Sequence, residues 1–362
     1  MPMTTSPYTF DPLPERAVPP GAFPFAAIGL DHGHIEGMVE GLTAAGGTLT
    51  WVFDTDPNRA AALAKKYPTA RIATSEQQVL GDEAVRLVAT AAIPSERAGV
   101  GLRAIDAGKH AFVDKAPLTT FAQLAAVREA TARTGLKYAV YYGERLHSEA
   151  AVLAGQLIAR DAIGTVLNVA SFGPHKIGTG RPDWFWDPAQ YGGILCDIGS
   201  HNFDQMLVYT GAADGDVLSA TVANRAHPET PAFEDHGDAH VRFDNGATGY
   251  VRVDWFTPDS LGVFGDGRTF ILGTDGYIEL RKYVDIGTDN GGGQLLLVNE
   301  HGQQRFDARG MTGFPYFGQL IRDCLEGTET AMTQAHALKA AELSLIAQST
   351  AAASSPVPVS VR

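Results

Sequence analysis

The segment YGGILCDIGSHNFDQM, residues 191–206, carries Asp197 and His201 four positions apart in an otherwise apolar run. Side chains at positions i and i+4 of a helix project from the same side, so the two groups can act on one object. That object is a substrate hydroxyl, a metal ion or the other side chain of the pair. A histidine with its pKa near the working pH is suited to act as a general base on a hydroxyl.

A third candidate is Lys115, which directly follows a predicted buried strand, HAFVD. Open α/β folds bind their ligands at the carboxyl ends of the strands. An ammonium group there can polarise a hydroxyl or a carbonyl, although an ordinary lysine at a strand end has the same sequence signature.

A dinucleotide-binding turn would read G-x-G-x-x-G after the first predicted strand, where this chain reads GLDHGHIEG. Gly29 matches the first glycine, but Asp31 and His34 replace the other two. Asp54 ends the next predicted strand, 25 residues after Gly29. A carboxylate there would bind the ribose hydroxyls of adenosine and repel a 2′-phosphate, which predicts NAD over NADP. Arg59 would weaken this preference.

The same DHGH segment allows a rival interpretation as a metal site. In a metal-dependent hydrolase built on a (β/α)₈ barrel, His32 and His34 would bind a divalent ion together with a carboxylate from a later strand. Such a barrel needs alternating strands and helices throughout. This chain abandons the alternation after roughly residue 150, which disfavours the barrel.

The elements that must position these groups follow from the periodicity. Strand and helix patterns alternate in the first part, which predicts a doubly wound parallel sheet, and β-rich segments follow, with a hairpin signal at Asn245–Gly246. We expect an α/β protein with an N-terminal Rossmann-type domain and a C-terminal α+β domain that has an open, mostly antiparallel sheet. The predicted parts are an extended proline-rich arm over residues 1–22, the dinucleotide-binding domain over 23–145, the substrate and oligomerisation domain over 146–312, and helices over 313–362 that pack back on the body.

The composition excludes several partners. The chain has 362 residues with 28 Lys and Arg against 41 Asp and Glu, and this excess of negative charge opposes nucleic-acid binding. No run approaches the ~20 apolar residues of a membrane span, and the proline-rich start does not resemble an export signal. The two cysteines do not indicate a disulfide framework. We therefore predict a cytoplasmic protein without a membrane or nucleic-acid partner.

Four segments resemble the glucose–fructose oxidoreductase, inositol dehydrogenase and MocA family, and they occur in the family's order: FDTDPNRAAALAKKY, GKHAFVDKAPLTT, YYGERL and YGGILCDIGSHNFDQMLVYTG. The most specific pattern is G-G-x-x-x-D-x-x-x-H-x-x-D, which starts at Gly192 and contains Asp197, His201 and Asp204. The resemblance implies NAD or NADP in the first domain and a sugar or cyclitol in the cleft. It also implies that Lys115 is the lysine of the family's E-K-P motif and that Asp197 and His201 face a substrate hydroxyl.

The chain departs from the family's pattern at two places. In DKAP, Asp114 replaces glutamate and Pro117 stands one position late. In IPSER, Pro94 is displaced and Arg97 takes the place of a histidine. These changes predict a divergent subgroup with altered contacts on the nicotinamide side.

The predicted function is the transfer of a hydride between a nicotinamide cofactor, preferably NAD, and a secondary alcohol of a sugar, sugar derivative or cyclitol. His201 is the predicted general base, Lys115 stabilises the alkoxide, and Asp197 orients the site. The alternatives are the metal-dependent hydrolase and a non-catalytic, sugar-sensing protein of the same fold. The predicted cofactor-binding residues are Gly29, Leu30, Asp31, His32, Gly33, His34, Ile35, Asp54, Arg59, Ala92, Ile93, Pro94, Asp114 and Lys115, and the predicted substrate-binding residues are Lys115, Arg145, His175, Trp184, Asp197 and His201.

The strand ATGYVRVDW predicts how the chain assembles. It alternates so that Val251 and Val253 share one face of the second sheet and Tyr250 and Arg252 the other. A sheet face that helices leave bare tends to be a contact surface, and two-fold symmetry is the commonest way to bury it. We expect a homodimer or a tetramer of such dimers. The proline-rich arm is expected to be disordered or to lie against a neighbouring subunit.

Overall fold

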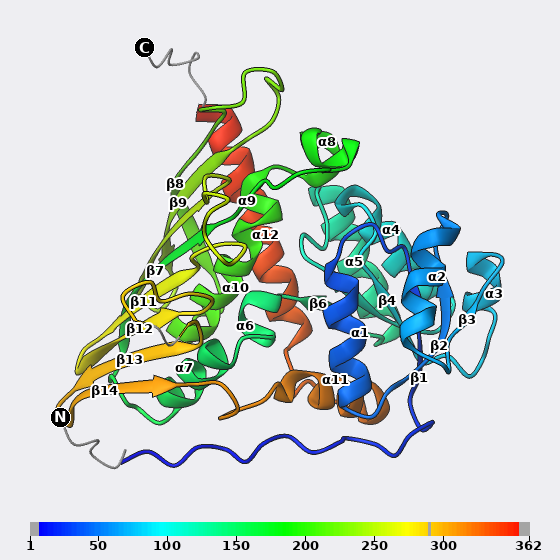
Figure 1. Cartoon of the computed structure of the whole chain (residues 1–362), viewed down its shortest axis with the longest axis horizontal. Coiled ribbons are helices and arrows are strands. Elements are labelled where there is room, and N and C mark those ends of the chain that lie inside the picture. Colours follow the sequence, from blue (N-terminus) through cyan, green and yellow to red (C-terminus); the bar gives the residue numbers. More distant parts are fainter. Residues whose placement is uncertain (1–6, 289–290, 355–362) are drawn as a thin grey trace.

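The protein is described by a computed structural model that covers residues 7–288 and 291–354. Its strands form two sheets (Figure 1). The first has six parallel strands in the order β3-β2-β1-β4-β5-β6, and the second has eight strands in the order β14-β13-β12-β11-β7-β10-β9-β8. The predicted fold class, a Rossmann-type sheet followed by an open, mostly antiparallel sheet, is confirmed.

The first sheet is a doubly wound unit whose strands are apolar on both faces, as helices on both sides require. Its strand order reverses between β1 and β4, so the carboxyl ends of these two strands form the switch point where such folds bind ligands. Its elements are β1 Pro24–Ile28, α1 His34–Ala44, β2 Thr48–Phe53, α2 Pro57–Lys66, β3 Arg71–Ile72, α3 Glu76–Leu80, β4 Leu87–Thr90, α4 Pro94–Asp106, β5 His110–Asp114, α5 Phe121–Thr134 and β6 Tyr138–Tyr141.

Local sequence explains where several of these helices start. Asp56 accepts a hydrogen bond from the backbone N–H of Asn58 at the start of α2, and Pro57 occupies the first turn. Thr120 and Gln123 form a capping box at the start of α5.

The second sheet pairs its strands antiparallel except for β7 and β10, which run parallel. The predicted hairpin at Asn245–Gly246 joins β9 to β10, and Gly246 has a φ of +88°, the left-handed conformation that such turns need. The elements of this half are α6 Gly143–Leu146, α7 Glu149–Ala159, β7 Val166–Pro174, η1 Asp183–Trp186, α8 Pro188–Tyr191, α9 Ile194–Asp197, α10 Gly199–Thr210, β8 Gly215–Ala223, β9 His236–Phe243, β10 Thr248–Asp254, β11 Arg268–Gly273, β12 Gly276–Arg281, β13 Gln294–Asn299, β14 Gly302–Asp307, α11 Pro315–Glu326 and α12 Gln334–Ser354.

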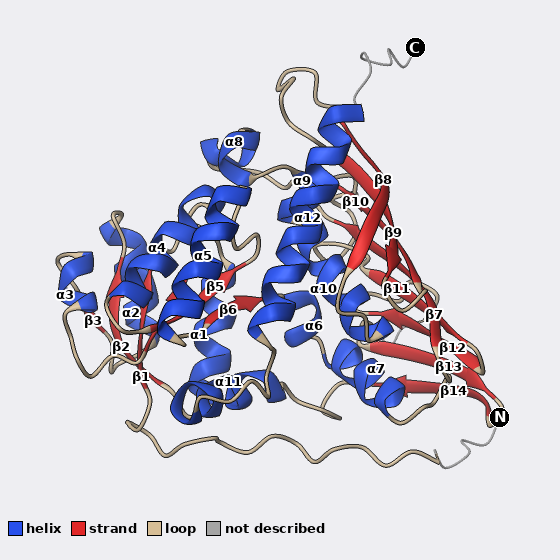
Figure 2. Cartoon of the chain, turned by 180° about the vertical axis from the view of Figure 1, so that it is seen from behind, coloured by secondary structure: helices blue, strands red, loops and turns tan. Residues whose placement is uncertain are grey.

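Helices cover one face of the eight-stranded sheet (Figure 2). The covered face carries Val251 and Val253, which are fully buried, and Gly249, where an added Cβ would lie 2.4 Å from Met206 Sδ. Within the described residues no element covers the opposite face. The long helix α12 packs on β8 and also contacts α5 and β6, so it holds the two sheets together.

The proline-rich arm is ordered over residues 7–22 and lies against its own chain, so the expectation of disorder is wrong for this part, whereas a contact with a neighbouring subunit stays a prediction. From residue 7 to residue 22 it runs beside both domains (Figure 1). Asp11 pairs with Arg160 of α7 at 2.5 Å, and the backbone N–H of Ala17 donates to Ala45 O at 2.8 Å. Phe10 packs edge-on against Phe306 of β14, with 5.7 Å between ring centroids. Residues 1–6 of the predicted arm and 355–362 of the predicted C-terminal helices lie outside the described residues.

No helix of the described chain is long and apolar enough to cross a membrane.

Candidate active site

An ion pair between the two domains marks the site. Lys115, which follows β5, places its Nζ 2.7 Å from Asp197 Oδ1 at the end of α9. Both residues are buried. Burial alone would raise the pKa of the Asp197 carboxyl, but the Lys115 ammonium more than offsets this and lowers the pKa. The pair therefore carries both charges.

Asp197 and His201 do not share one continuous helix, as their spacing predicted. Helix α9 ends at Asp197 and α10 begins at Gly199, with Ile198 between them. The backbone N–H of His201 donates to Ile198 O at 3.2 Å, a tight turn at the start of α10. Asp197 is held by Lys115 instead of by His201, so the two side chains do not bind each other.

The environment of His201 changes its expected protonation. The side chain is 3% exposed, and its Nδ1 is buried without a hydrogen-bond partner in the described part of the chain. Burial and the nearby Lys115 ammonium lower the pKa of His201 well below its ordinary value of 6.5. His201 is therefore a neutral imidazole at neutral pH, not a group that titrates near pH 7.

Asp114 is the centre of a buried polar cluster beside this pair. Its two oxygens contact Arg97 Nη2 at 3.0 Å, His32 Nδ1 at 2.8 Å and His34 Nδ1 at 2.9 Å, and they accept from the Lys115 backbone N–H at 2.8 Å. Burial opposes ionisation of Asp114, but Arg97 and the histidines hold its pKa well below the usual range. An ionised carboxylate only accepts, so each imidazole must donate its Nδ1–H. Burial lowers the pKa of His32 to about 3, so this ring is neutral and its Nε2 is left as an acceptor.

The rival metal interpretation requires these same groups. Ligand atoms of His32, His34 and Asp114 lie within 4.8 Å of one another. Arg97 and the Lys115 backbone already occupy the same carboxylate, and these donors explain the cluster without a cation. The hydrolase alternative also required a (β/α)₈ barrel, and the two open sheets exclude that architecture.

Arg97 holds the turn that carries Lys115. It is 1% exposed, pairs with Asp114, and donates to Ala92 O at 2.6 Å, to Ala116 O at 3.3 Å and to Lys115 O. The peptide bond from Lys115 to Ala116 is cis. Arg97 stands where the family's pattern has a histidine. In the structure its guanidinium connects the end of β4 to the residues after β5.

The backbone conformation of the turn between β1 and α1 suits the binding of a dinucleotide. Gly29 has a φ of +70°, and an added Cβ would lie 2.7 Å from Ala92 Cβ, so only glycine suits this position. Gly33 precedes α1, no side chain caps the helix, and nothing lies within 4 Å of a Cβ built at Gly33. The helix N-terminus is therefore open to a pyrophosphate.

Asp54 lies at the end of β2, where a ribose-binding carboxylate is expected. It accepts from the Leu30 backbone N–H at 2.6 Å and from Arg59 Nη2 at 2.8 Å. The same Arg59 nitrogen lies 2.9 Å from Asp31 Oδ1. Burial raises the pKa of Asp31, and Arg59 opposes that shift. Arg59 thus offsets the negative charge of two carboxylates, Asp31 and Asp54, at the predicted adenosine end of the site.

The remaining predicted cofactor residues are placed as follows. Ala92 and Ile93 follow β4, and Pro94 begins α4, so all three stand at the carboxyl edge of the sheet. Ile35 lies in the first turn of α1 but is buried in the core, 4% exposed.

A cleft of about 530 Å³ runs beside the Lys115–Asp197 pair. Of the predicted substrate residues it brings together Lys115, His175, Trp184 and Asp197. His201 lines an adjoining cavity of about 300 Å³. The two cavities share His34, Glu144 and Tyr283.

Arg145 does not line this cleft, in contrast to the sequence prediction. It is half-buried, and its Nε and Nη2 each lie 2.7 Å from an oxygen of Asp204. His336 of α12 contacts the same carboxylate at 2.8 Å. The guanidinium serves this buried network because Asp204, the last residue of the family pattern, would otherwise be an unpaired buried charge.

Sequence reasoning missed Glu144, the residue before Arg145. Its carboxylate pairs with Lys282 and accepts from Tyr283 Oη at 2.7 Å. Burial alone would raise the pKa of Glu144, but Lys282 lowers it below the usual range. The position of Glu144 just after β6, at the edge where Lys115 follows β5, could have indicated it. Nothing in the sequence around Lys282 and Tyr283 pointed to the cleft.

The fold and the cleft together define a two-domain protein whose first domain has a dinucleotide-binding fold and whose cleft opens between the domains. Residues 26–142 match the oxidoreductase family with an NAD-binding Rossmann fold, and residues 152–279 match the GFO/IDH/MocA C-terminal domain. The chain belongs to the GFO/IDH/MocA family, and its first domain is the NAD-binding domain of that family. The predicted family and cofactor are confirmed.

Several individual proteins are similar to this chain. A solved structure from Erwinia carotovora atroseptica, assigned as an oxidoreductase, is 48% identical, with a TM-score of 0.88 over 91% of this chain and 98% of that one. The 1,5-anhydro-D-fructose reductase of Ensifer adhaerens is 24% identical over 75% of this chain and 78% of that protein. An uncharacterised oxidoreductase of Schizosaccharomyces pombe is 25% identical, but the match spans only 46% of this chain and 45% of that one. Levoglucosan dehydrogenase, solved with NADH and levoglucosan, shares the fold at 18% identity, with a TM-score of 0.77 over 92% of this chain and 98% of that one.

Proposed function

We propose that the protein is an NAD-dependent dehydrogenase that oxidises or forms a secondary alcohol on a sugar, sugar derivative or cyclitol. The observation that carries this proposal is the buried Lys115–Asp197 ion pair, which lies in a cleft at the carboxyl edge of the NAD-binding sheet. The neutral His201 lies in the cavity that adjoins this cleft.

Each group has one role in this proposal. Lys115 donates a hydrogen bond to the substrate oxygen and stabilises alkoxide character, and Asp197 orients the ammonium. His201 accepts the hydroxyl proton, for which its neutral form is required. When bound, the nicotinamide supplies or accepts the hydride.

The lining of the cleft supports a polyhydroxylated substrate. It combines aromatic surfaces such as Trp184 and Trp255 with polar groups such as His175 and Glu144. Aromatic faces with a few placed polar groups suit the alternating apolar and hydroxyl surfaces of a sugar ring. The reductase and dehydrogenase relatives act on sugar derivatives by their names, which supports the same substrate class for this chain.

A spectrophotometric panel tests the proposal. Sugars, sugar acids and cyclitols are incubated with NAD, and reduced nicotinamide is followed by its absorbance. We expect turnover of at least one compound, abolished in Lys115→Ala. Binding of NAD without turnover of any compound in either direction would favour the sugar-sensing alternative.

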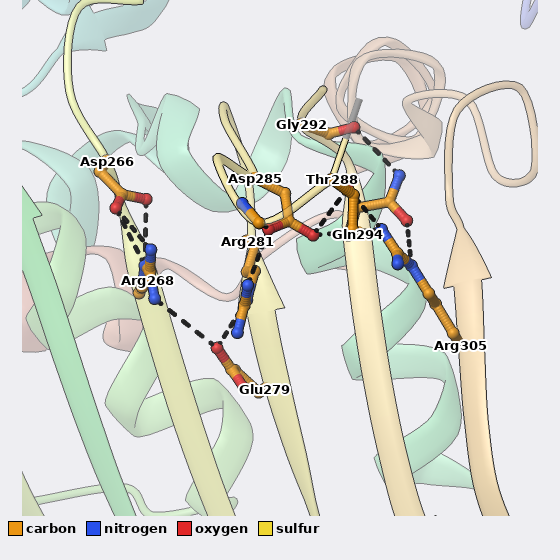
Figure 3. Close-up of polar contacts among 10 residues, drawn as sticks. Asp266, Arg268, Glu279, Arg281, Asp285, Thr288, Gly292, Gln294 and Arg305 are labelled. Atoms are coloured by element: carbon orange, nitrogen blue, oxygen red, sulfur yellow. Dashed lines mark hydrogen bonds and ion pairs between the residues drawn. The ribbon is translucent and has the colours of Figure 1, made fainter. Parts of the chain in front are cut away.

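We also propose that the outward face of the eight-stranded sheet is the contact between subunits. Phe270 and Leu272 of β11 are 36% and 41% exposed there, and Phe270 stacks on Tyr277 of β12 at 5.1 Å. Figure 3 shows a row of ion pairs across the ends of the same strands, in which Arg281 contacts both Glu279 and Asp285. These charges are satisfied within the chain, which leaves the apolar centre as the unpartnered part of the face.

The compartment that we propose is the cytoplasm. Cys196 and Cys324 are both free thiols, as a reducing compartment would maintain.

A further inference from the structure

The charged groups of the cleft are paired within the protein, with one exception. Lys115 pairs with Asp197, and Glu144 pairs with Lys282. Arg181 also lines the cleft, from the loop between β7 and η1. In the part of the chain that the structure describes, no carboxylate lies within ion-pair distance of its guanidinium.

The groups that hold Arg181 in place are neutral. Its Nη2 donates to Lys176 O at 2.9 Å, and its Nε donates to Ile177 O. The guanidinium carbon lies 4.5 Å from the centre of the Phe185 ring and 5.1 Å from that of Trp255. These contacts fix the side chain beside the cleft, while Nη1 has no acceptor among the described residues.

Aromatic rings stabilise such a cation but do not neutralise it. Cation–π contacts are weak attractions, whereas a partly buried charge without a counterion loses much of its hydration. Burial accordingly lowers the pKa of Arg181, and the distant Asp197 only partly opposes the shift. Among the described residues that line the cleft, Arg181 is therefore the one charged group without a partner of opposite charge.

We propose that Arg181 binds an anionic group of the substrate, so that the substrate is a sugar acid or a sugar phosphate instead of a neutral sugar. The inference rests on the proposed function and narrows its substrate class. The shared chemistry is a carboxylate or phosphate, which the planar guanidinium can bind through two N–H groups. His175 lies on the same aromatic surface, with its ring 5.6 Å from Trp255, and can contact a neighbouring hydroxyl.

Calorimetric titration into the protein saturated with NADH tests this inference. The probes are D-glucuronate, D-gluconate, D-glucose 6-phosphate and D-glucose. We expect at least one anionic sugar to bind about 10-fold or more tightly than D-glucose, because a desolvated charge pair contributes at least that much. Which anion binds best distinguishes a carboxylate from a phosphate site.

The variant Arg181→Gln keeps a polar side chain but removes the charge. It is expected to weaken binding of the preferred anion about 100-fold and to change the affinity for D-glucose by no more than about 2-fold. Arg133→Gln, at an exposed residue of α5, is the matched control and should change neither affinity.

Two results would overturn the inference. One is equal or tighter binding of D-glucose than of every anion by the wild-type protein. The other is an equal loss of affinity for all sugars in Arg181→Gln together with a lower Tm, which would show a purely structural role. Turnover of neutral sugars with NAD in either case would leave the proposed function standing, whereas absence of both binding and turnover for every probe would reject the two proposals together.

Discussion

Lys115 Nζ lies 2.7 Å from Asp197 Oδ1, and this contact connects the end of β5 in the NAD-binding domain to the end of α9 in the second domain. Because both groups are buried, loss of either one leaves an unpaired charge in the cleft. The pair therefore couples the position of the proposed catalytic ammonium to the packing of the two domains.

Removal of the ammonium should abolish most of the activity. Lys115→Ala is expected to lower kcat by about 10²–10⁴, since the alkoxide loses its hydrogen-bond donor. The measurement is steady-state kinetics with the best compound of the panel, with NAD affinity determined in parallel. Lys176→Ala, on a cleft-side loop but hydrogen-bonded to backbone oxygens, is the matched control. Wild-type kcat in Lys115→Ala with intact NAD binding would mean that the active site lies elsewhere.

The pH profile should report the lowered pKa of His201. A base works only when it is unprotonated, and burial with Lys115 keeps His201 neutral until the pH is well below 6.5. In the oxidation direction kcat/KM should therefore stay level from pH 8 to 6.5 and fall only at lower pH. His201→Ala should lower kcat by about 10²–10⁴ and remove the dependence of the remaining activity on this group. A decline of wild-type kcat/KM that is already half complete at pH 7 would contradict the assignment.

Arg97 should position Lys115 without touching substrate. Arg97→Lys keeps a positive charge beside Asp114 but cannot reproduce the fork of donors to Ala92 and Lys115 carbonyls. We expect kcat to fall about 10-fold or more with KM little changed. Arg97→Gln should cost in addition about 3 kcal/mol of unfolding free energy, because Asp114 then lacks its counterion. Chemical unfolding and kinetics are measured on both variants, and equal kcat in wild type and Arg97→Lys would refute the positioning role.

NAD should bind at least about 10-fold more tightly than NADP. Asp54 follows β2, where a ribose-binding carboxylate disfavours a 2′-phosphate, and Arg59 is already shared between Asp54 and Asp31. Asp54→Ala should weaken the binding of NAD and reduce the difference in affinity between NAD and NADP. Calorimetry measures the affinity for each cofactor, and equal affinities or tighter binding of NADP by the wild-type protein would contradict the prediction.

The outward sheet face should hold two chains together. Light scattering at micromolar concentration is expected to give a mass of two or four times 38.4 kDa. Phe270→Asp should shift that mass toward one chain, since it places a charge in the apolar centre of the face. The exposed Arg309→Asp, on the turn after β14, serves as the control. A wild-type mass near 38.4 kDa would exclude the dimer.

The sequence alone was sufficient to predict those features that depend on residues close together in the chain. Alternating apolar strands and helices predicted the first sheet, the β-rich segments after them predicted the second, and Asn245–Gly246 predicted the hairpin, because backbone periodicity and turn chemistry act over a few residues. Lys115 and Asp197 were recognisable as candidates since each stands in a short pattern with its own spacing.

Only the tertiary structure decided how these candidates are used. Lys115 and Asp197 are 82 residues apart in the chain, and Glu144 and Lys282 are 138 apart, so both pairs depend on tertiary packing, and the first also depends on how the two domains meet. The same packing directs Arg145 to Asp204, and among the described residues it brings no carboxylate to Arg181. It also buries His201 and so removes its titration from neutral pH. Spacing along a chain shows which groups are available, whereas burial and partners from distant segments determine their charge and their role.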